Sequence, residues 1–259
     1  MARNIQNILE TSDEVRRLVN FDDCSCLVIV APGKPFRTEK AVVMLGGRGS
    51  TATETNITSY EASPFRHELL RRGFTILCPV CGSDHWGGPA SSRIALRVLE
   101  QLPSSGLPVA KPLPVMGFSM GSLGAMMFAV RHPEWVQRLI GVFGGYDLPD
   151  IRRRIEPYRP GIDAVYPTPE RLAESTPYAH IGQLRRIPVR LFHGTADKLV
   201  PCEYSQRLCG MLKAAGGEVD LTLVPGVGHS NELLALAKDN LLAALSNDVC
   251  SAGFACTIG

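Results

Sequence analysis

Apolar residues in this chain gather in short runs that are rich in β-branched side chains, several of them nearly continuous. Such runs are typical of strands covered on both faces, as in a parallel sheet. The segments between the runs show helix start and stop signals instead. The predicted strands are residues 26–30, 41–45, 74–80, 114–117, 139–143, 189–193 and 219–224.

The segment 64–72 illustrates the helix signals. Ser63 and Pro64 precede an apolar-periodic stretch that contains Phe65, and Gly73 follows it. A serine cap, a first-turn proline and a C-terminal glycine are the residues that start and end helices. Further helices are predicted over residues 89–102, 120–132, 202–215 and 230 to about 245. The alternation predicts an α/β fold, with an open, doubly wound, mostly parallel sheet and helices on both faces.

One proline-rich interval, residues 145–188, interrupts this alternation and holds one convincing short helix, which begins near Thr168. We expect a small cap or lid inserted between two strands rather than a second domain, so residues 1–259 are expected to form a single domain. The interval contains Arg152 to Arg154, which would suit an anionic substrate. However, its seven arginines face six acidic residues, which favours a solvated charged surface.

Composition restricts the classes of function. Twenty-seven Lys and Arg against 25 Asp and Glu give a net charge of +2 without long single-sign blocks, which argues against a nucleic-acid partner. The first 20 residues contain no apolar core typical of a secretory signal. The longest weakly polar run, residues 120–130, is shorter than the roughly 20 residues of a membrane span. We therefore expect a soluble cytoplasmic protein without a membrane partner, and a homo-oligomer stays open.

Eight cysteines in a chain without a secretory signal indicate reduced thiols rather than a disulfide framework. An alternative pairs Cys24 and Cys26 with Cys78 and Cys81 as a four-thiolate zinc site. Because Cys26 and Cys78 lie in strand-like runs whose successive side chains point to opposite faces, no metal is expected. The two cysteines of the C-terminal tail receive no role.

The pentapeptide at residues 117–121, Gly-Phe-Ser-Met-Gly, carries the first chemical signal. Alone, a Gly-x-Ser-x-Gly match is weak, but this one lies between a predicted strand and a predicted helix, which is the context of a nucleophile elbow. Its two glycines permit the sharp turn that the elbow requires. Ser119 is therefore the candidate nucleophile. The Met120 N–H, at the start of the helix, is a candidate donor of an oxyanion hole.

A serine hydroxyl needs an adjacent base to become a nucleophile. Of the six histidines, His229 lies in a glycine-rich loop between a predicted strand and a predicted helix, where its side chain can reach over the sheet edge. His229 is therefore the candidate base. His85 and Trp86 follow another strand and are expected to form part of the wall of the substrate pocket. Structural roles are expected for His67, His132, His180 and His193.

The base needs an acid that holds its tautomer and stabilises its protonated form. Asp197 lies in a loop directly after a predicted strand and is the candidate acid, with Asp147 as the weaker alternative. The order Ser119, Asp197, His229 is the one expected of a nucleophile elbow on this kind of sheet. All three residues also follow strands, where open α/β sheets build their sites.

The loop at residues 46–50, Gly-Gly-Arg-Gly-Ser, is the candidate source of the second oxyanion donor. Its glycines let backbone N–H groups approach an acyl oxygen closely, so the N–H of Gly47 or of Arg48 is expected to donate. A phosphate-binding role is disfavoured because no Gly-Lys-Ser/Thr ending follows.

These motifs together resemble the α/β-hydrolase superfamily, over roughly residues 40–245. The most similar members are small relatives of dienelactone hydrolases, carboxylesterases and the catalytic domains of prolyl-oligopeptidase-type peptidases. The resemblance implies a Ser–His–Asp triad, no cofactor, and hydrolysis through a covalent acyl-enzyme. Leu45 stands where many members have histidine. The resemblance rests on residues 117–121, His-Pro-Glu at 132–134, Ile-Pro-Val at 187–189, His-Gly-Thr-Ala-Asp at 193–197, Val-Pro at 200–201 and Gly-His at 228–229.

The function expected on these grounds is that of a serine hydrolase which cleaves a small-molecule carboxylic ester. A peptidase or amidase would use the same catalytic residues and differ only in its pocket. A non-catalytic binding protein on the same fold is the alternative from another class. Acyl transfer and lyase chemistry in the same pocket also stay open.

Overall fold

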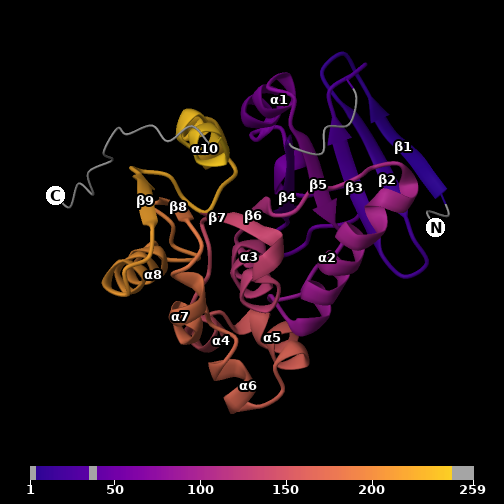
Figure 1. Ribbon diagram of the computed structural model, residues 1–259. Coiled ribbons are helices and arrows are strands. Elements are labelled where there is room, and N and C mark those ends of the chain that lie inside the picture. The colour runs from indigo at the N-terminus through magenta and orange to yellow at the C-terminus, as the bar shows by residue number, and fades with distance from the viewer. Residues whose placement is uncertain (1–3, 35–39, 247–259) are drawn as a thin grey trace.

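The computed structural model describes residues 4–34 and 40–246, which form one nine-stranded sheet with helices on both sides (Figure 1). The strand order is β1-β2-β3-β5-β4-β6-β7-β8-β9. The six strands from β5 to β9 in this order are parallel, and β1, β2 and β3 extend the sheet in antiparallel fashion. The strands are β1 (Asn4–Glu10), β2 (Val15–Asn20), β3 (Ser25–Val30), β4 (Ala41–Leu45), β5 (Thr75–Pro79), β6 (Leu113–Phe118), β7 (Val136–Val142), β8 (Val189–Gly194) and β9 (Val219–Val224).

Two apolar cores lie on the two faces of the sheet, because successive strand residues point to opposite faces. In β4, Val43 and Leu45 belong to the core beneath α2, α3 and α8, whereas Val42 and Met44 belong to the core beneath α1, α9 and α10. The predicted α/β architecture with helices on both faces is thereby confirmed (Figure 1). These helices are α1 (Ser63–Arg71), α2 (Pro89–Gln101), α3 (Met120–Arg131), α8 (Glu203–Ala214), α9 (Glu232–Leu236) and α10 (Lys238–Leu245).

All seven predicted strands are present, with ends that differ by at most three residues from the prediction. Two predicted helices differ in detail. Helix α1 has Ala62 at its cap, and Ser63 lies inside its first turn, so Ser63 does not cap it. The single helix expected from 230 to about 245 is wrong, because the chain leaves helical geometry at Ala237 and forms α9 and α10 instead.

The interval 145–188 was expected to hold one short helix, and this expectation is also wrong. Pro149, Pro160 and Pro169 lie in the first turns of three helices, where the missing proline N–H would have had no partner anyway. The prolines therefore start helices here and do not break them. Figure 1 shows these helices gathered beside α3. They are α4 (Leu148–Arg154), α5 (Arg159–Val165), α6 (Pro169–Ala173) and α7 (Ile181–Leu184), with one-turn 3-10 helices at η5 (Glu156–Tyr158) and η6 (Pro177–His180).

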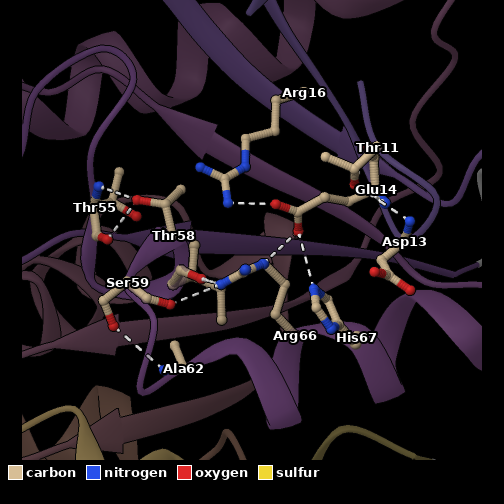
Figure 2. Close-up of polar contacts among 11 residues, drawn as sticks. Thr11, Asp13, Glu14, Arg16, Thr55, Thr58, Ser59, Ala62, Arg66 and His67 are labelled. Atoms are coloured by element: carbon tan, nitrogen blue, oxygen red, sulfur yellow. Dashed lines mark hydrogen bonds and ion pairs between the residues drawn. The ribbon is translucent and has the colours of Figure 1, made fainter. Parts of the chain in front are cut away.

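The hairpin β1–β2, which the sequence does not predict, pairs with β3 and is also linked to α1 by a buried carboxylate. Glu14, at the bend of the hairpin, is 3% exposed and forms ion pairs with Arg16 and with Arg66 of α1, which is 4% exposed (Figure 2). The Nε2 of His67 lies 3.7 Å from the same carboxylate. A charge this far from water needs such partners, so the pair fixes the hairpin against α1.

Arg66 extends this connection to the turn at η2 (Asn56–Thr58). Its Nη1 donates hydrogen bonds to the carbonyl oxygens of Ile57 at 2.6 Å and Ser59 at 3.0 Å (Figure 2). The guanidinium thereby satisfies two backbone acceptors of a turn and a carboxylate of the hairpin at once. One side chain of α1 thereby joins the distant hairpin to the turn that precedes this helix in sequence. Further 3-10 turns are η3 (Leu102–Ser105) and η4 (Pro133–Trp135).

Two negative observations apply to residues 4–34 and 40–246. No helix in these ranges combines the length and the apolar character needed to cross a bilayer. Nor do three or more His, Cys, Asp or Glu side chains form a group that could hold a metal ion, so the four-thiolate arrangement is not formed. Burial instead raises the pKa of the Cys78 thiol to about 12. Cys250 and Cys256 lie outside the described residues.

Candidate active site

Ser119 occupies a sharp turn between β6 and α3. Its backbone has φ 52° and ψ −118°, and its N–H donates a 2.9 Å hydrogen bond to the carbonyl of Val142 in the neighbouring strand β7. Gly121 faces the carbonyl oxygens of Leu45 and Gly46 so closely that a Cβ there would collide with them. The glycine is therefore needed for α3 to start directly behind the serine, as the pentapeptide predicts.

Backbone strain is concentrated around this turn. In the part of the chain that the structure describes, the non-glycine residues with positive φ are Trp86 at 44°, Ser119 at 52° and Phe143 at 39°. Phe143 directly follows β7, Ser119 directly follows β6, and Trp86 lies in the loop after β5. Such conformations cost about 1–3 kcal/mol each and cluster at functional sites. The strain therefore marks the carboxyl edge of the parallel strands as the candidate site.

The structure brings together the three side chains that the sequence predicts to meet. The Nε2 of His229 lies 2.8 Å from the Oγ of Ser119, and its Nδ1 lies 2.6 Å from the Oδ2 of Asp197. A carboxylate oxygen only accepts, so the Nδ1 carries the proton and the lone pair of Nε2 faces the hydroxyl. The imidazole and the ring of Phe143 also pack in a T-shaped arrangement, with 4.8 Å between the ring centroids.

Asp197 is enclosed by hydrogen-bond donors. Its Oδ1 accepts from the backbone N–H groups of Leu199 at 3.0 Å and Val200 at 2.8 Å. Burial by itself would raise the pKa of this carboxyl, but hydrogen bonds from His193 and His229 outweigh burial and hold the pKa of Asp197 well below its ordinary value. Asp197 therefore carries a negative charge beside His229 at neutral pH.

Two residues make contacts other than those that the sequence predicts: His193, expected to be structural, and Asp147, the alternative acid. His193 is fully buried, and its Nε2 lies 3.2 Å from the Oδ2 of Asp197, a contact that the sequence reasoning missed. The available signal was its position at the end of β8, four residues before Asp197. Asp147, the alternative acid, instead forms a 3.0 Å ion pair with Arg207 and accepts from the N–H of Asp150 as the cap of α4.

The loop after β4 approaches the candidate nucleophile. Gly47 is so close to Ser119 that a Cβ on the glycine would lie 3.3 Å from the serine Cβ. The N–H of Gly47 donates to the Oδ1 of Asn56 at 2.7 Å, and the Nδ2 of Asn56 donates to the Oδ1 of Asn231 at 2.9 Å. By contrast, the N–H of Arg48 has no acceptor among the described residues.

His85 and Trp86 lie in the loop after β5 and are both buried. The Nδ1 of His85 accepts the N–H of Gly87 at 3.0 Å, and the absence of a Cβ on Gly124 leaves room for the imidazole ring against α3. Burial lowers the pKa of His85 to about 4, so this ring is neutral at neutral pH. The indole N–H of Trp86 is buried without a hydrogen-bond partner.

The helical segment after β7 contacts two of these loops. The ring of Tyr158 lies 5.2 Å from that of Trp86 and 5.0 Å from the guanidinium of Arg48. Arg48 also forms a 3.2 Å ion pair with Asp84. The segment 145–188 therefore packs against the loops after β4 and β5, beside the turn that carries Ser119.

Comparison with known proteins adds a short match in sequence. No family model matches the chain. A segment of 46 residues, 18% of the chain, is 44% identical to acyl-protein thioesterase 1 of Gibberella zeae. The matched segment spans only a fifth of the length of that relative.

Similarity to solved structures extends over most of the chain. An S-formylglutathione hydrolase from Agrobacterium tumefaciens superposes with a TM-score of 0.73 at 14% identity, covering 94% of this chain and 100% of that one. Est1E from Butyrivibrio proteoclasticus gives 0.65 at 17% identity, covering 88% and 98%. A puromycin-hydrolyzing peptidase of Mycobacterium tuberculosis gives 0.70 at 17% identity, covering 93% of this chain and 40% of its own. The strand order, the turn at Ser119 and these superpositions identify the fold of this chain as the α/β-hydrolase fold.

Proposed function

We propose that the protein is a serine hydrolase that cleaves small carboxylic esters through an acyl-enzyme, with Ser119, His229 and Asp197 as its catalytic triad. The observation that carries the proposal is the position of the His229 imidazole, with one nitrogen 2.8 Å from a hydroxyl and the other 2.6 Å from an ionised carboxylate. This arrangement is the one that activates a serine hydroxyl for acyl transfer.

In the acylation step, the Oγ of Ser119 attacks the ester carbonyl while its proton moves to the Nε2 of His229. Asp197 stabilises the imidazolium that forms and keeps Nδ1 protonated. The tetrahedral intermediate collapses when the C–O bond to the alcohol breaks and the alcohol oxygen takes the proton from Nε2. A water molecule then repeats the sequence on the acyl-enzyme, releases the acid and restores the Ser119 hydroxyl.

The negative charge on the carbonyl oxygen requires two donors near Ser119. The N–H of Met120 begins α3, where the helix dipole also favours an anion. For the second donor, the hydrogen bond from Gly47 to Asn56 favours the N–H of Arg48, which lacks an acceptor among the described residues. The sequence left these two residues as alternatives.

A small ester is the substrate class that we favour, with His85 and Trp86 as the proposed wall of its pocket. The contacts of Tyr158 with Trp86 and with Arg48 support a pocket of limited size beside this proposed wall. The proteins of similar structure include a peptidase as well as Est1E. Amide cleavage is therefore the alternative that the experiment must distinguish from ester cleavage.

The proposal is tested with the purified chain, a fluorophosphonate probe and two substrate series. We expect the probe to label Ser119, and p-nitrophenyl esters to turn over faster than aminoacyl p-nitroanilides. The acyl-chain length that gives the highest kcat/KM then indicates the length of the acyl-binding pocket. Folded protein that neither reacts with the probe nor turns over any substrate would overturn the proposal and favour a binding protein, and faster anilide turnover would favour a peptidase.

A further inference from the structure

A second histidine contacts the carboxylate of the candidate triad from the interior side. The Nε2 of His193 faces two oxygens that only accept, the Oδ2 of Asp197 at 3.2 Å and the carbonyl of Val200 at 2.8 Å. This nitrogen therefore carries a proton and donates it. The Oδ2 that receives it is the same atom that accepts the Nδ1–H of His229. Two imidazoles thus share one carboxylate oxygen.

The other nitrogen of His193 is fixed by a serine. Its Nδ1 lies 2.7 Å from the Oγ of Ser205, a fully buried residue of α8. In the neutral imidazole this nitrogen accepts the hydroxyl proton, and the bond keeps the ring proton on Nε2. Ser205 therefore selects the tautomer in which His193 donates to Asp197.

The polar chain continues from Ser205 toward α3. The hydroxyl of Tyr146 lies 2.7 Å from the Oγ of Ser122, three residues after the candidate nucleophile, and it also interacts with Ser205, which lowers the pKa that burial raises. Ser122, Tyr146 and Ser205 are each 0% exposed. Gly141 and Gly144 lie so close to the Tyr146 hydroxyl that a Cβ at either position would collide with it. Burying a series of polar side chains lowers the stability of the fold unless each of them has a hydrogen-bond partner.

We propose that His193, held by Ser205, is a positioning residue that draws negative charge from the shared oxygen of Asp197 and thereby limits the basicity of His229. The inference rests on the proposed triad. His193 does not contact the Ser119 hydroxyl, and it acts through the carboxylate alone. Each donor to a carboxylate stabilises its charge, so less of that charge is available to stabilise the His229 imidazolium.

Other titratable groups also face this site. The Cys202 thiol lies before the first turn of α8 and interacts with the charge of Asp197, and the Tyr146 phenol stands behind Ser205. Burial raises the pKa of both groups, so both remain neutral below pH 8. A change in the acidic limb of the activity profile then reports on the histidines and Asp197.

The test measures kcat/KM against pH for wild type and three variants on one ester substrate. His193→Leu removes the donor, so we expect the midpoint of the rising acidic limb to move to higher pH by about half a unit to one unit. Ser205→Ala should give a smaller shift in the same direction, because it weakens the donor without removing it. His193→Gln places an amide N–H near the position of Nε2 and should return the midpoint toward the wild-type value. His180→Gln, at a half-buried histidine whose imidazole contacts Gln183 and the carbonyl of Glu174, is the control for the loss of an imidazole.

A purely structural role would lower the unfolding temperature of His193→Leu and leave the midpoint in place. Folded His193→Leu and Ser205→Ala proteins with the wild-type midpoint would therefore overturn the inference. If His193→Leu does not fold, Ser205→Ala decides alone. The downfield proton resonance of the His229 Nδ1–H provides a second readout, which we expect to shift in both variants. This resonance does not depend on turnover, so an inactive wild type would refute the proposed function separately.

Discussion

The Oγ of Ser119 and the Nε2 of His229 lie 2.8 Å apart although 110 residues separate them in sequence. Ser119 directly follows β6, and His229 lies in the loop after β9. Because these strands belong to the parallel part of the sheet, both residues lie at the same edge. The distance is short enough for direct proton transfer. The proposed triad rests on this contact.

The carboxylate of Asp197 should be worth several orders of magnitude in rate. Asp197→Asn retains the shape of the side chain but can leave the proton on the wrong nitrogen of His229, so we expect kcat to fall about 10⁴-fold. Asp147→Asn is the matched control, because the carboxylate of Asp147 pairs with Arg207 rather than with His229, and it should keep kcat within a few-fold. Steady-state kinetics on a p-nitrophenyl ester measures both. Equal losses in the two variants would contradict the assignment of the acid.

The backbone conformation of Ser119 should make a glycine variant at this position more stable than an alanine variant. With φ 52° and ψ −118°, the residue lies in a region that glycine adopts without penalty. Ser119→Gly should therefore unfold at higher free energy than Ser119→Ala, by about 1–3 kcal/mol. Both variants should lose roughly 10⁴–10⁶ in kcat because they lack the nucleophile. Urea denaturation compares them, and equal stabilities would show that the turn relaxes around alanine.

Variants of Arg48 show whether its own N–H or that of Gly47 is the second oxyanion donor. Arg48→Pro removes the backbone N–H, and loss of one such donor costs about 10²–10³ in kcat. Arg48→Ala keeps the N–H and removes only the side chain with its contacts to Asp84 and Tyr158, so its kcat should stay within about ten-fold of wild type. Kinetics of the two variants, with thermal unfolding to confirm the fold, decides between them. If both lose kcat equally, the side chain matters, and Gly47 becomes the favoured donor.

How much the sequence could predict depends on the range of the interactions involved. Ser119, Asp197 and His229 were found because each follows a strand with a local signature, and a parallel sheet aligns such strand ends. The contact of His193 with Asp197 could not be found that way. A histidine in a buried strand has the same local pattern whether it only packs or donates to a carboxylate.

The hairpin β1–β2 was missed for a similar reason. Five of the seven residues of β1 are exposed, Asn4 to Asn7 and Glu10, so the strand lacks an apolar pattern and exists through its pairing with β2.

The prolines of residues 145–188 led to the opposite error, in which helices that are present were not predicted. Pro149 and Pro160 look like helix breakers in sequence, whereas their position within the first turn decides their effect.

His85 should make the protein lose stability on mild acidification. Its pKa is about 4 in the folded chain against 6.5 for an ordinary histidine, because burial disfavours the charged ring. The unfolded chain therefore binds the extra proton first as pH falls below 6.5, and the fold loses about 3 kcal/mol from this group by pH 4. His85→Asn keeps an acceptor for the Gly87 N–H but does not titrate in this range. Chemical denaturation from pH 7 to 4 should show a shallower decline for the variant, and parallel curves would contradict the burial of a neutral ring.

The buried ion pair between Glu14 and Arg66 should be costly to break from one side. In Figure 2 the guanidinium of Arg66 faces both the Glu14 carboxylate and the carbonyls of the η2 turn, and both side chains are at most 5% exposed. Glu14→Gln leaves a buried cation without its counterion and should lower the free energy of unfolding by about 3–5 kcal/mol. Arg66→Met leaves Glu14 with Arg16 and should cost less. The double variant buries no unpaired charge from this pair, so its loss of stability should be smaller than the sum of the single losses.

Urea denaturation of all four proteins gives the coupling free energy between Glu14 and Arg66. Glu68→Gln, at the ion pair with Arg71 on the surface of α1, is the control. Additive losses would show that solvent reaches the pair and that the hairpin is held to α1 by its apolar contacts.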